Sequence, residues 1–471
     1  MIQIVSESTK GAVVEFGFEK EEGKFKGKAL ETLFYPEKDG KEVLYIGLGK
    51  KEETAGSQTD ENICKVLVKE AAAKAVKELR SHDIYEFSMN ISAVAEKFGT
   101  ESVRDIAEGA LLADYEQIQY PGKDCRKTEI ELTGIEGSEA EAASAILSEY
   151  EAVIEGVRFA RDMVNMPGNK LRPEDFAGEV LNLVKDTEIE AQVFHLEDLK
   201  KMKMDALLGV GESSEFPPCL VVLRYMGDPE CEEVKGLVGK GVTCDTGGYC
   251  LKPAASMGGI RGDMAGGAAV AGAVYALAKN RVKTNAVAVI PMCENRISDG
   301  SLLPGDVINS YAGKTIEIAN TDAEGRLILA DAVSYAVKQE KVTHILDIAT
   351  LTGAVVNMLG FTIGGVISDD QEWFDRFRRA YQVSGERYWR LPVYPEHEKM
   401  IKSKVADIRN MGESCCGTIT AGLFIKSFAE GKPWLHLDIA GTAWVEPPVF
   451  EFQSAGATGA GVTSIYQLCR Q

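Results

Sequence analysis

The most informative stretch of the chain reads Asn320-Thr-Asp-Ala-Glu-Gly-Arg-Leu327. In an extended segment, side chains two residues apart share one face, so Asp322, Glu324 and Arg326 are expected to point the same way. Hard divalent cations bind clustered carboxylate oxygens. The octapeptide therefore predicts a cation site made by two carboxylates with a guanidinium beside them.

The flanks of the octapeptide predict where that site lies in the fold. Residues 314–319 alternate like a strand, whereas residues 327–338 carry apolar side chains at helical spacing. The two acids are thus expected at a junction between a strand and a helix. Open α/β sheets usually place their ligand sites at such junctions.

A second run, residues 238–269, is rich in glycine and contains Lys240, Asp245, Lys252 and Asp263. Charged side chains in a small, apolar run are costly to bury without a partner, and a metal ion would supply one. Taken alone, each run has a plainer interpretation, a solvated turn or a charge at a helix start. Two such runs in one chain favour the metal site.

Composition limits the classes of protein that the chain can belong to. Its 471 residues predict two or three domains, and its net charge of −20 disfavours binding to nucleic acid. The ten cysteines form no Cys-x-x-Cys pair, and the charged first 25 residues do not resemble a signal peptide. These features predict a cytoplasmic protein.

Apolar runs and helical periodicity predict an α/β fold with two domains, residues 1–140 and 141–471, joined by the polar connection 123–141. In the first domain we expect a strand at Val43–Leu48 and a helix at Asn62–Leu79, and a helix at 142–162 should open the second. Strand-length runs between helical stretches then predict a mostly parallel, helix-covered central sheet in the second domain; these runs are Leu220–Leu223, Val234–Val238, Ala286–Ile290, His344–Ile348 and Leu435–Ile439.

Other chemistries find little support in the sequence. None of the five histidines forms a His-Glu-x-x-His motif, and His344 and His436 are expected in the core. No Gly-x-Ser-x-Gly elbow or phosphate-binding loop is present. The uncharged stretch 348–368 is better interpreted as a buried strand, a loop and an apolar helix than as a membrane span. The vicinal Cys415 and Cys416 are expected to be a neutral structural pair.

Both charged runs resemble the two defining motifs of the leucyl aminopeptidase family, whose members are di-metal exopeptidases. The octapeptide matches the family pattern at every position, and the four charged residues of the glycine-rich run match in identity and spacing. The resemblance covers about residues 150–465 and is weak or absent in the first 140 residues. It includes the further motifs Ala160-Arg-Asp-Met-Val-Asn165, Pro304-Gly-Asp-Val307, Ala349-Thr-Leu-Thr-Gly-Ala354, Ile419-Thr-Ala-Gly422 and His436-Leu-Asp-Ile-Ala-Gly-Thr-Ala443.

This resemblance implies two divalent metal ions per subunit, and Mn²⁺, Zn²⁺ and Mg²⁺ are the candidate ions. Asp245 and Glu324 are expected to lie between both ions, and Asp322 to bind one of them. Lys240 and Asp263 are expected to bind the other ion, with Lys240 as a neutral amine. Paired metals of this kind lower the pKa of a shared water and polarise the peptide carbonyl.

Two further residues are implied to be catalytic. Lys252 is expected to stay protonated and to stabilise the negative tetrahedral intermediate. Arg326 is associated in this family with a bound bicarbonate that acts as base, and a guanidinium suits a planar oxyanion. Pairing of Arg326 with a neighbouring acid is the alternative.

The resemblance also implies a substrate pocket lined by Ile260, Thr350 and Gly353. Two departures from the family pattern bear on it. Cys244 stands where an aromatic residue is usual, and Met257-Gly-Gly-Ile260 stands where Met-Asp-x-Met is common. Neither change touches an implied ligand, so they bear on substrate preference.

Three functions follow as hypotheses. The first is a broad aminopeptidase that prefers leucine-like residues at the free N-terminus of peptides. The second is a narrower dipeptidase that acts on substrates such as Cys-Gly. The third is a DNA-binding or structural oligomer, which the net charge of −20 opposes. The resemblance also implies a homohexamer.

Overall fold

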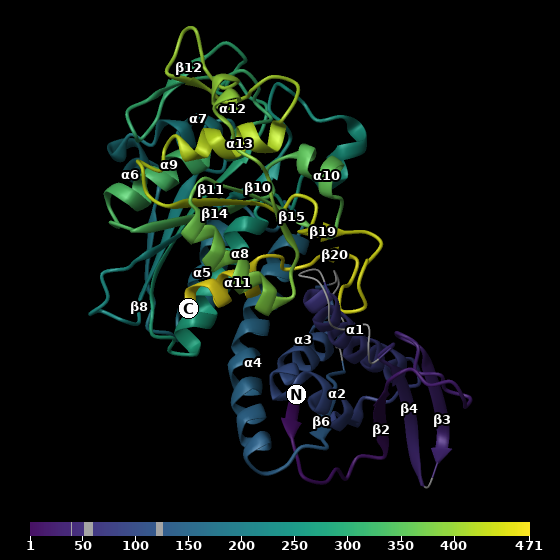
Figure 1. The fold of residues 1–471 in the computed structure, drawn as a ribbon. Coiled ribbons are helices and arrows are strands. Elements are labelled where there is room, and N and C mark those ends of the chain that lie inside the picture. The colour runs from purple at the N-terminus through teal and green to yellow at the C-terminus, as the bar shows by residue number, and fades with distance from the viewer. Residues whose placement is uncertain (39, 51–59, 119–125) are drawn as a thin grey trace. The chain divides into compact units, whose positions relative to one another are not determined.

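A computed structural model describes residues 1–38, 40–50, 60–118 and 126–471 (Figure 1). These residues form two compact units, Met1–Ile154 with Glu446–Ala455, and Glu155–Val445 with Gly456–Gln471. Both units combine helices with a mixed, largely parallel sheet, which confirms the predicted α/β class.

The division between the units differs from the predicted boundary at 140/141. Helix α4 (Gly137–Asn165) runs without a break past residue 154, so the change of unit falls inside a helix. The predicted connection also contains strand β6 (Glu129–Thr133), while its residues 123–125 lie outside the described part of the chain. The charged residues of this strand made its sequence look like a polar connection. In the structure the Glu129 carboxylate is satisfied by an ion pair with Lys10 at 3.0 Å.

The first unit has a six-stranded sheet in the order β1-β6-β5-β2-β4-β3. All neighbouring strands are parallel except β3 and β4. The predicted strand and helix are confirmed as β4 and α1. Besides β6 and the start of α4, the elements of this unit are β1 (Ile2–Ile4), β2 (Ala12–Gly17), β3 (Thr32–Lys38), β4 (Lys41–Gly47), β5 (Glu86–Asn90), α1 (Asp60–Ser81), α2 (Ser92–Phe98), η1 (Thr100–Ser102) and α3 (Val103–Ala113).

The second unit has a nine-stranded sheet in the order β16-β15-β18-β14-β9-β11-β8-β7, with β10 paired to β11. The central strands β18, β14, β9, β11 and β10 run parallel, and all five predicted strands are confirmed. The strands are β7 (Glu190–Phe194), β8 (Cys219–Met226), β9 (Lys235–Gly239), β10 (Gly241–Asp245), β11 (Asn285–Asn295), β14 (His344–Ala349), β15 (Gly364–Ser368), β16 (Tyr388–Arg390) and β18 (Trp434–Asp438).

Helices cover both faces of this sheet, as predicted. The longest are α5 (Pro173–Val184), α8 (Ala265–Lys279), α9 (Glu324–Lys338), α11 (Gln371–Ser384) and α13 (Gly417–Lys426). In Figure 1 α9 and α13 lie on one side of the strands and α8 and α11 on the other. The apolar side chains of α9 and α13 share one core cluster with Val238 of β9 and with alternate residues of β11. The shorter helices are α6 (Leu196–Met202), α7 (Asp205–Gly211), η2 (Ala254–Gly259), α10 (Gly353–Leu359), α12 (Pro395–Lys399) and α14 (Val462–Cys469).

Smaller pieces complete the second unit. A three-stranded sheet joins β12 (Val307–Asn309), β13 (Thr315–Glu317) and β17 (Ile408–Arg409), and a two-stranded one joins β19 (Trp444–Val445) and β20 (Gly456–Ala457). The uncharged stretch 348–368 contains the end of β14, a loop, α10 and β15. Within the described residues, no helix combines the length and the apolarity needed to cross a bilayer.

Helix α8, which begins two residues after Asp263, packs so closely on its neighbours that glycine is required. A Cβ on Gly266 would lie 2.0 Å from the Ile348 oxygen of β14. Where α8 crosses α4, a Cβ on Gly272 would lie 2.5 Å from the Gly156 oxygen. Both contacts are with backbone, which cannot move aside as a flexible side chain can.

We therefore expect Gly272→Ala to destabilise the protein by about 1–3 kcal/mol, the usual cost of overpacking. The matched control is Gly178→Ala in α5, where nothing lies within 4 Å of the new Cβ. Removing glycine from an open helical position should stabilise by about 0.5–1 kcal/mol. Urea unfolding of both variants measures the difference, and equal effects would contradict the close crossing.

Candidate metal centre

The residues of both charged runs meet at one edge of the central sheet. Lys240 lies between β9 and β10, Asp245 ends β10, and Thr350 follows β14. These strands run in the same direction, so their carboxyl ends share that edge. Glu324 is the first residue of α9 and Asp263 lies just before α8, so helix starts supply the remaining acids.

The octapeptide does not have the extended conformation on which the first prediction depended. Asp322 lies in a turn and Glu324 already belongs to α9. The turn is held by the Asn320 side chain, which accepts a hydrogen bond from the Asp322 N–H at 2.7 Å. The preceding strand, β13, belongs to the small sheet and not to the central one. The acids come together because a turn folds one of them back over the helix start.

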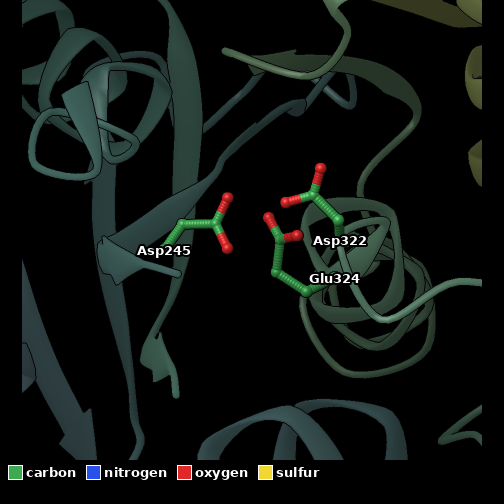
Figure 2. Close-up of side chains that lie close together, drawn as sticks. All are labelled: Asp245, Asp322 and Glu324. Atoms are coloured by element: carbon green, nitrogen blue, oxygen red, sulfur yellow. The ribbon is translucent and has the colours of Figure 1, made fainter. Parts of the chain in front are cut away.

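Three carboxylates converge on one point. Oxygens of Asp245, Asp322 and Glu324 lie within 4.8 Å of one another. Figure 2 shows Asp245 reaching in from one side and the other two from the opposite side. Asp245 and Glu324 are only 3% and 2% exposed, whereas Asp322 is exposed. The cluster is thus a buried group of acids with one member open to solvent.

Two lysines hold these acids. The Lys240 ammonium lies 2.7 Å from Asp263 and 2.8 Å from Glu324, and donates to the Thr350 oxygen at 3.1 Å. Lys252 lies 2.6 Å from Asp245 and also contacts Asp322. Four carboxylates therefore face two ammonium groups.

Burial and this excess of carboxylates alter the pKa values of the cluster. Burial, reinforced by the Asp245 carboxylate, raises the pKa of Glu324 to about 8 despite the Lys240 charge. Burial likewise raises the pKa of Asp263, to about 6. For Lys240, burial lowers the pKa, but the surrounding carboxylates outweigh it and the net shift is upward.

Unpartnered oxygens give a direct test of whether a cation fits. Within the described part of the chain, the buried Glu324 Oε2 has no hydrogen-bond partner. Asp263 Oδ2, by contrast, lies 2.7 Å from the Lys240 ammonium and is paired with it. Buried polar atoms without partners are costly and uncommon. The donor set, rich in carboxylate oxygens, fits hard divalent cations.

Arg326 lies in the first turn of α9 with its guanidinium buried. One nitrogen donates to the Asn410 oxygen at 2.9 Å, while Nε has no hydrogen-bond partner among the described residues. Burial lowers the pKa of Arg326 to about 10. No carboxylate of the described residues forms an ion pair with it, so the alternative of a neighbouring acid finds no support.

Two of the three residues assigned to the pocket contact candidate ligands. The Ile260 carbonyl accepts the Asp245 N–H at 3.0 Å, so the residue borders a candidate ligand. The Thr350 hydroxyl donates to Asp263 at 2.8 Å. Gly353 begins α10, is exposed, and has open space where a Cβ would project.

Sequence reasoning missed residues that hold these loops in place. Asp438 of β18 is fully buried and accepts a hydrogen bond from the Thr352 hydroxyl at 2.6 Å and from the Leu351 N–H at 3.2 Å. It thereby fixes the loop that carries Thr350. The expectation that His436 is a core residue is confirmed, because it is fully buried and lies 2.5 Å from Asp347. Cys415 and Cys416, which were expected to be a neutral structural pair, are exposed, unlike His436.

Comparisons with known proteins identify the family of the chain. Residues 158–466 match the model of the cytosol aminopeptidase family, catalytic domain, and residues 6–124 match that of its N-terminal domain. The second match corrects the expectation that the first 140 residues lack the resemblance. Their short strands carry no catalytic motif by which the relationship can be seen.

Curated relatives and a solved structure cover nearly the whole chain. A probable cytosol aminopeptidase of Clostridium perfringens is 41% identical over 91% of this chain and 86% of its own length. One of Treponema denticola is 38% identical over 95% of this chain and 93% of its own length. The bottromycin maturation enzyme BotP, solved in complex with Mn, has a TM-score of 0.88 at 29% identity and covers 98% of this chain and 99% of its own.

The leucyl aminopeptidase resemblance is thus confirmed by both family models and by relatives that span the chain. The chain belongs to the cytosol aminopeptidase family, metal-dependent hydrolases that release amino acids from the N-terminus of peptides.

Proposed function

We propose that the protein is an exopeptidase that binds two divalent metal ions per subunit and prefers leucine-like N-terminal residues. The observation that supports this best is the group of three carboxylates within 4.8 Å of one another, backed by Asp263 and Lys240. When bound, such ions lower the pKa of a water and polarise the scissile carbonyl. The ligand set is Lys240, Asp245, Asp263, Asp322 and Glu324.

Mn²⁺, Zn²⁺ and Mg²⁺ remain the candidate ions, because the set combines carboxylate oxygens with one amine. Lys240 can join it only as a neutral amine. Its ammonium forms ion pairs with Asp263 and Glu324, the same carboxylates that a cation would bind. Nearby positive charge lowers the pKa of a lysine, so Lys240 would release its proton.

Lys252 is assigned to the transition state. Its side chain is 22% exposed, and the ammonium faces the open side of the cluster, beside Asp245 and Asp322. A fixed positive charge there would stabilise the oxyanion of the tetrahedral intermediate. Arg326 would hold a bicarbonate ion that serves as base, since its guanidinium is buried and forms no ion pair with any carboxylate that the structure describes.

We also propose that the protein is a cytoplasmic homohexamer that acts on peptides with a free N-terminus. Exposed large apolar side chains such as Phe361 and Trp389, 55% and 61% exposed, would serve as contacts between subunits. Binding to nucleic acid stays disfavoured by the net charge of −20.

Replacing Glu324 and Lys252 separates metal binding from transition-state stabilisation. Glu324→Ala should abolish turnover and lower metal content, because it removes a carboxylate that both ions are proposed to share. Lys252→Ala should keep its metal and lose about 100- to 1000-fold in kcat, the usual cost of one oxyanion donor. Metal analysis of purified variants, together with kinetics on leucyl amides, measures both. Loss of metal in Lys252→Ala would contradict this assignment.

Metal affinity should rise with pH. Between about pH 4 and 8 the folded, metal-free protein holds protons on Asp263 and Glu324 that the unfolded chain has released, so its stability falls across that window. A divalent cation competes with those protons, so affinity for Mn²⁺ should increase by up to about tenfold per pH unit for each proton released.

Calorimetric titration in buffers of different ionisation enthalpy counts the released protons. The matched control is Asp331→Asn, which removes another buried carboxylate of α9, one whose pKa burial raises to about 7. Asp331 accepts hydrogen bonds from backbone N–H groups, including that of Tyr311 at 2.7 Å. The Asp331→Asn substitution should therefore leave the change of Mn²⁺ affinity with pH unaltered. A flat affinity in the unsubstituted protein would mean that the cluster is already ionised.

Side-chain preference should depend on Ile260. Isoleucine is stiffer and shorter than methionine, so the pocket should adapt poorly to long or aromatic residues. Ile260→Met should shift the ratio of kcat/KM for leucyl and phenylalanyl substrates by about 3- to 30-fold, with metal content unchanged. Ile118→Met, at an exposed position of the first unit, is the control. An unchanged ratio would show that Ile260 does not line the pocket.

A further inference from the structure

Asn295 links two of the loops that carry candidate metal ligands. It ends β11 directly beside Asp245 in the parallel register of β10 and β11, and is 5% exposed. Its side-chain nitrogen donates to Asp245 Oδ1 at 2.9 Å and to the Thr321 oxygen at 3.0 Å. One amide group thus joins the end of β10 to the turn that precedes α9.

Thr321 extends this link to a third loop. Its hydroxyl donates to the Gly247 oxygen at 2.7 Å and accepts the Cys250 N–H at 2.8 Å. Those two residues belong to the loop that ends in Lys252. The segments of Asp245, Lys252 and Asp322 are therefore held by one continuous set of hydrogen bonds that passes through Asn295 and Thr321.

The division of hydrogen bonds at Asp245 shows what Asn295 does there. Oδ1 accepts from Asn295 and from the Gly247 N–H, both at 2.9 Å, whereas Oδ2 faces Lys252 at 2.6 Å. Two donors on one oxygen fix the plane of the carboxylate and leave the other oxygen toward the cluster. Partners of this kind, which orient a ligand without touching the metal, tune metal affinity.

We propose that Asn295 is a positioning residue for the metal centre, and this inference rests on the proposed function. It holds Asp245 and the Asp322 turn at the separation that a cation requires. Without its two N–H donors, Asp245 Oδ1 keeps only the Gly247 N–H, and the turn loses its link to β11. The carboxylate is then held less firmly, so cations should bind more weakly.

The same strand provides a matched control at its other end. Asn285 begins β11, is 3% exposed, and donates from its side chain to the backbone oxygens of Asp228 at 2.7 Å and Cys231 at 2.9 Å. It is a buried asparagine that ties down a loop, as Asn295 is, but it contacts none of the candidate ligands. Leucine has the same branching and the same number of heavy side-chain atoms as asparagine, but no hydrogen-bonding group.

The experiment compares Asn295→Leu with Asn285→Leu by calorimetric titration of the metal-stripped proteins with Mn²⁺. Both variants should lose thermal stability, because each leaves backbone oxygens unpaired. Only Asn295→Leu should bind Mn²⁺ more weakly, by about 10- to 100-fold. Its kcat/KM should recover in part at high Mn²⁺. Wild-type affinity in Asn295→Leu, or an equal loss in Asn285→Leu, would overturn the proposal.

A second variant covers a failure of Asn295→Leu to fold. Asn295→Asp keeps the shape of the side chain, removes the N–H donors and adds negative charge. If charge alone governed the site, Mn²⁺ would bind more tightly; positioning predicts weaker binding, and tighter binding would reject it. If the wild-type protein takes up no Mn²⁺, the proposed metal centre itself fails. Normal uptake by the wild type and both Asn295 variants rejects the positioning role alone.

Discussion

Repulsion among four carboxylates in a largely buried site is the constraint that organises this molecule. Lys240 and Lys252 supply two positive charges against these four carboxylates. Burial, together with the excess of negative charge, raises the pKa of Glu324, whose Oε2 has no hydrogen-bond partner within the described residues. Left without a rigid frame, groups of like charge move apart toward solvent. The sheet edge, the helix starts and the hydrogen-bonded loops together prevent that movement, so the site keeps an arrangement that only cations or protons can relieve.

Glycine makes this frame possible at two points. Gly247 has φ +86°, and a Cβ there would lie 2.8 Å from Asp322 Oδ1. Gly325, directly after Glu324, would bring a Cβ within 2.7 Å of the Lys240 nitrogen. Any larger residue would displace a candidate ligand or its counter-ion. The high glycine content around both charged runs thus reflects the close approach of backbone to charged side chains.

Local pattern predicted much of this architecture, and its failures have physical causes. Uninterrupted apolar runs such as that of β11 indicate strands buried on both faces, a property of the segment itself. The extended octapeptide was wrong because residues two apart can also converge through a turn followed by a helix start. Strand β6 was missed because ion pairs with distant residues satisfy its acids. Asn295 was missed because its partner Thr321 lies on a separate turn, far along the chain, and no pattern within β11 reveals that contact.

The unequal burial of the two lysines is consistent with the opposite roles proposed for them. Lys240 is 3% exposed and enclosed by Asp263, Glu324 and the Thr350 oxygen, so it has nowhere else to place a charge when cations share those carboxylates. Loss of its proton is then the less costly outcome. Lys252 has a side chain that is 22% exposed, on a loop that the Thr321 hydroxyl supports. Displaced from Asp245 and Asp322, its ammonium can turn toward solvent and substrate and keep its proton. In the proposed function, the same residue type would thereby serve as a neutral ligand in one position and as a positive charge for the reaction in the other.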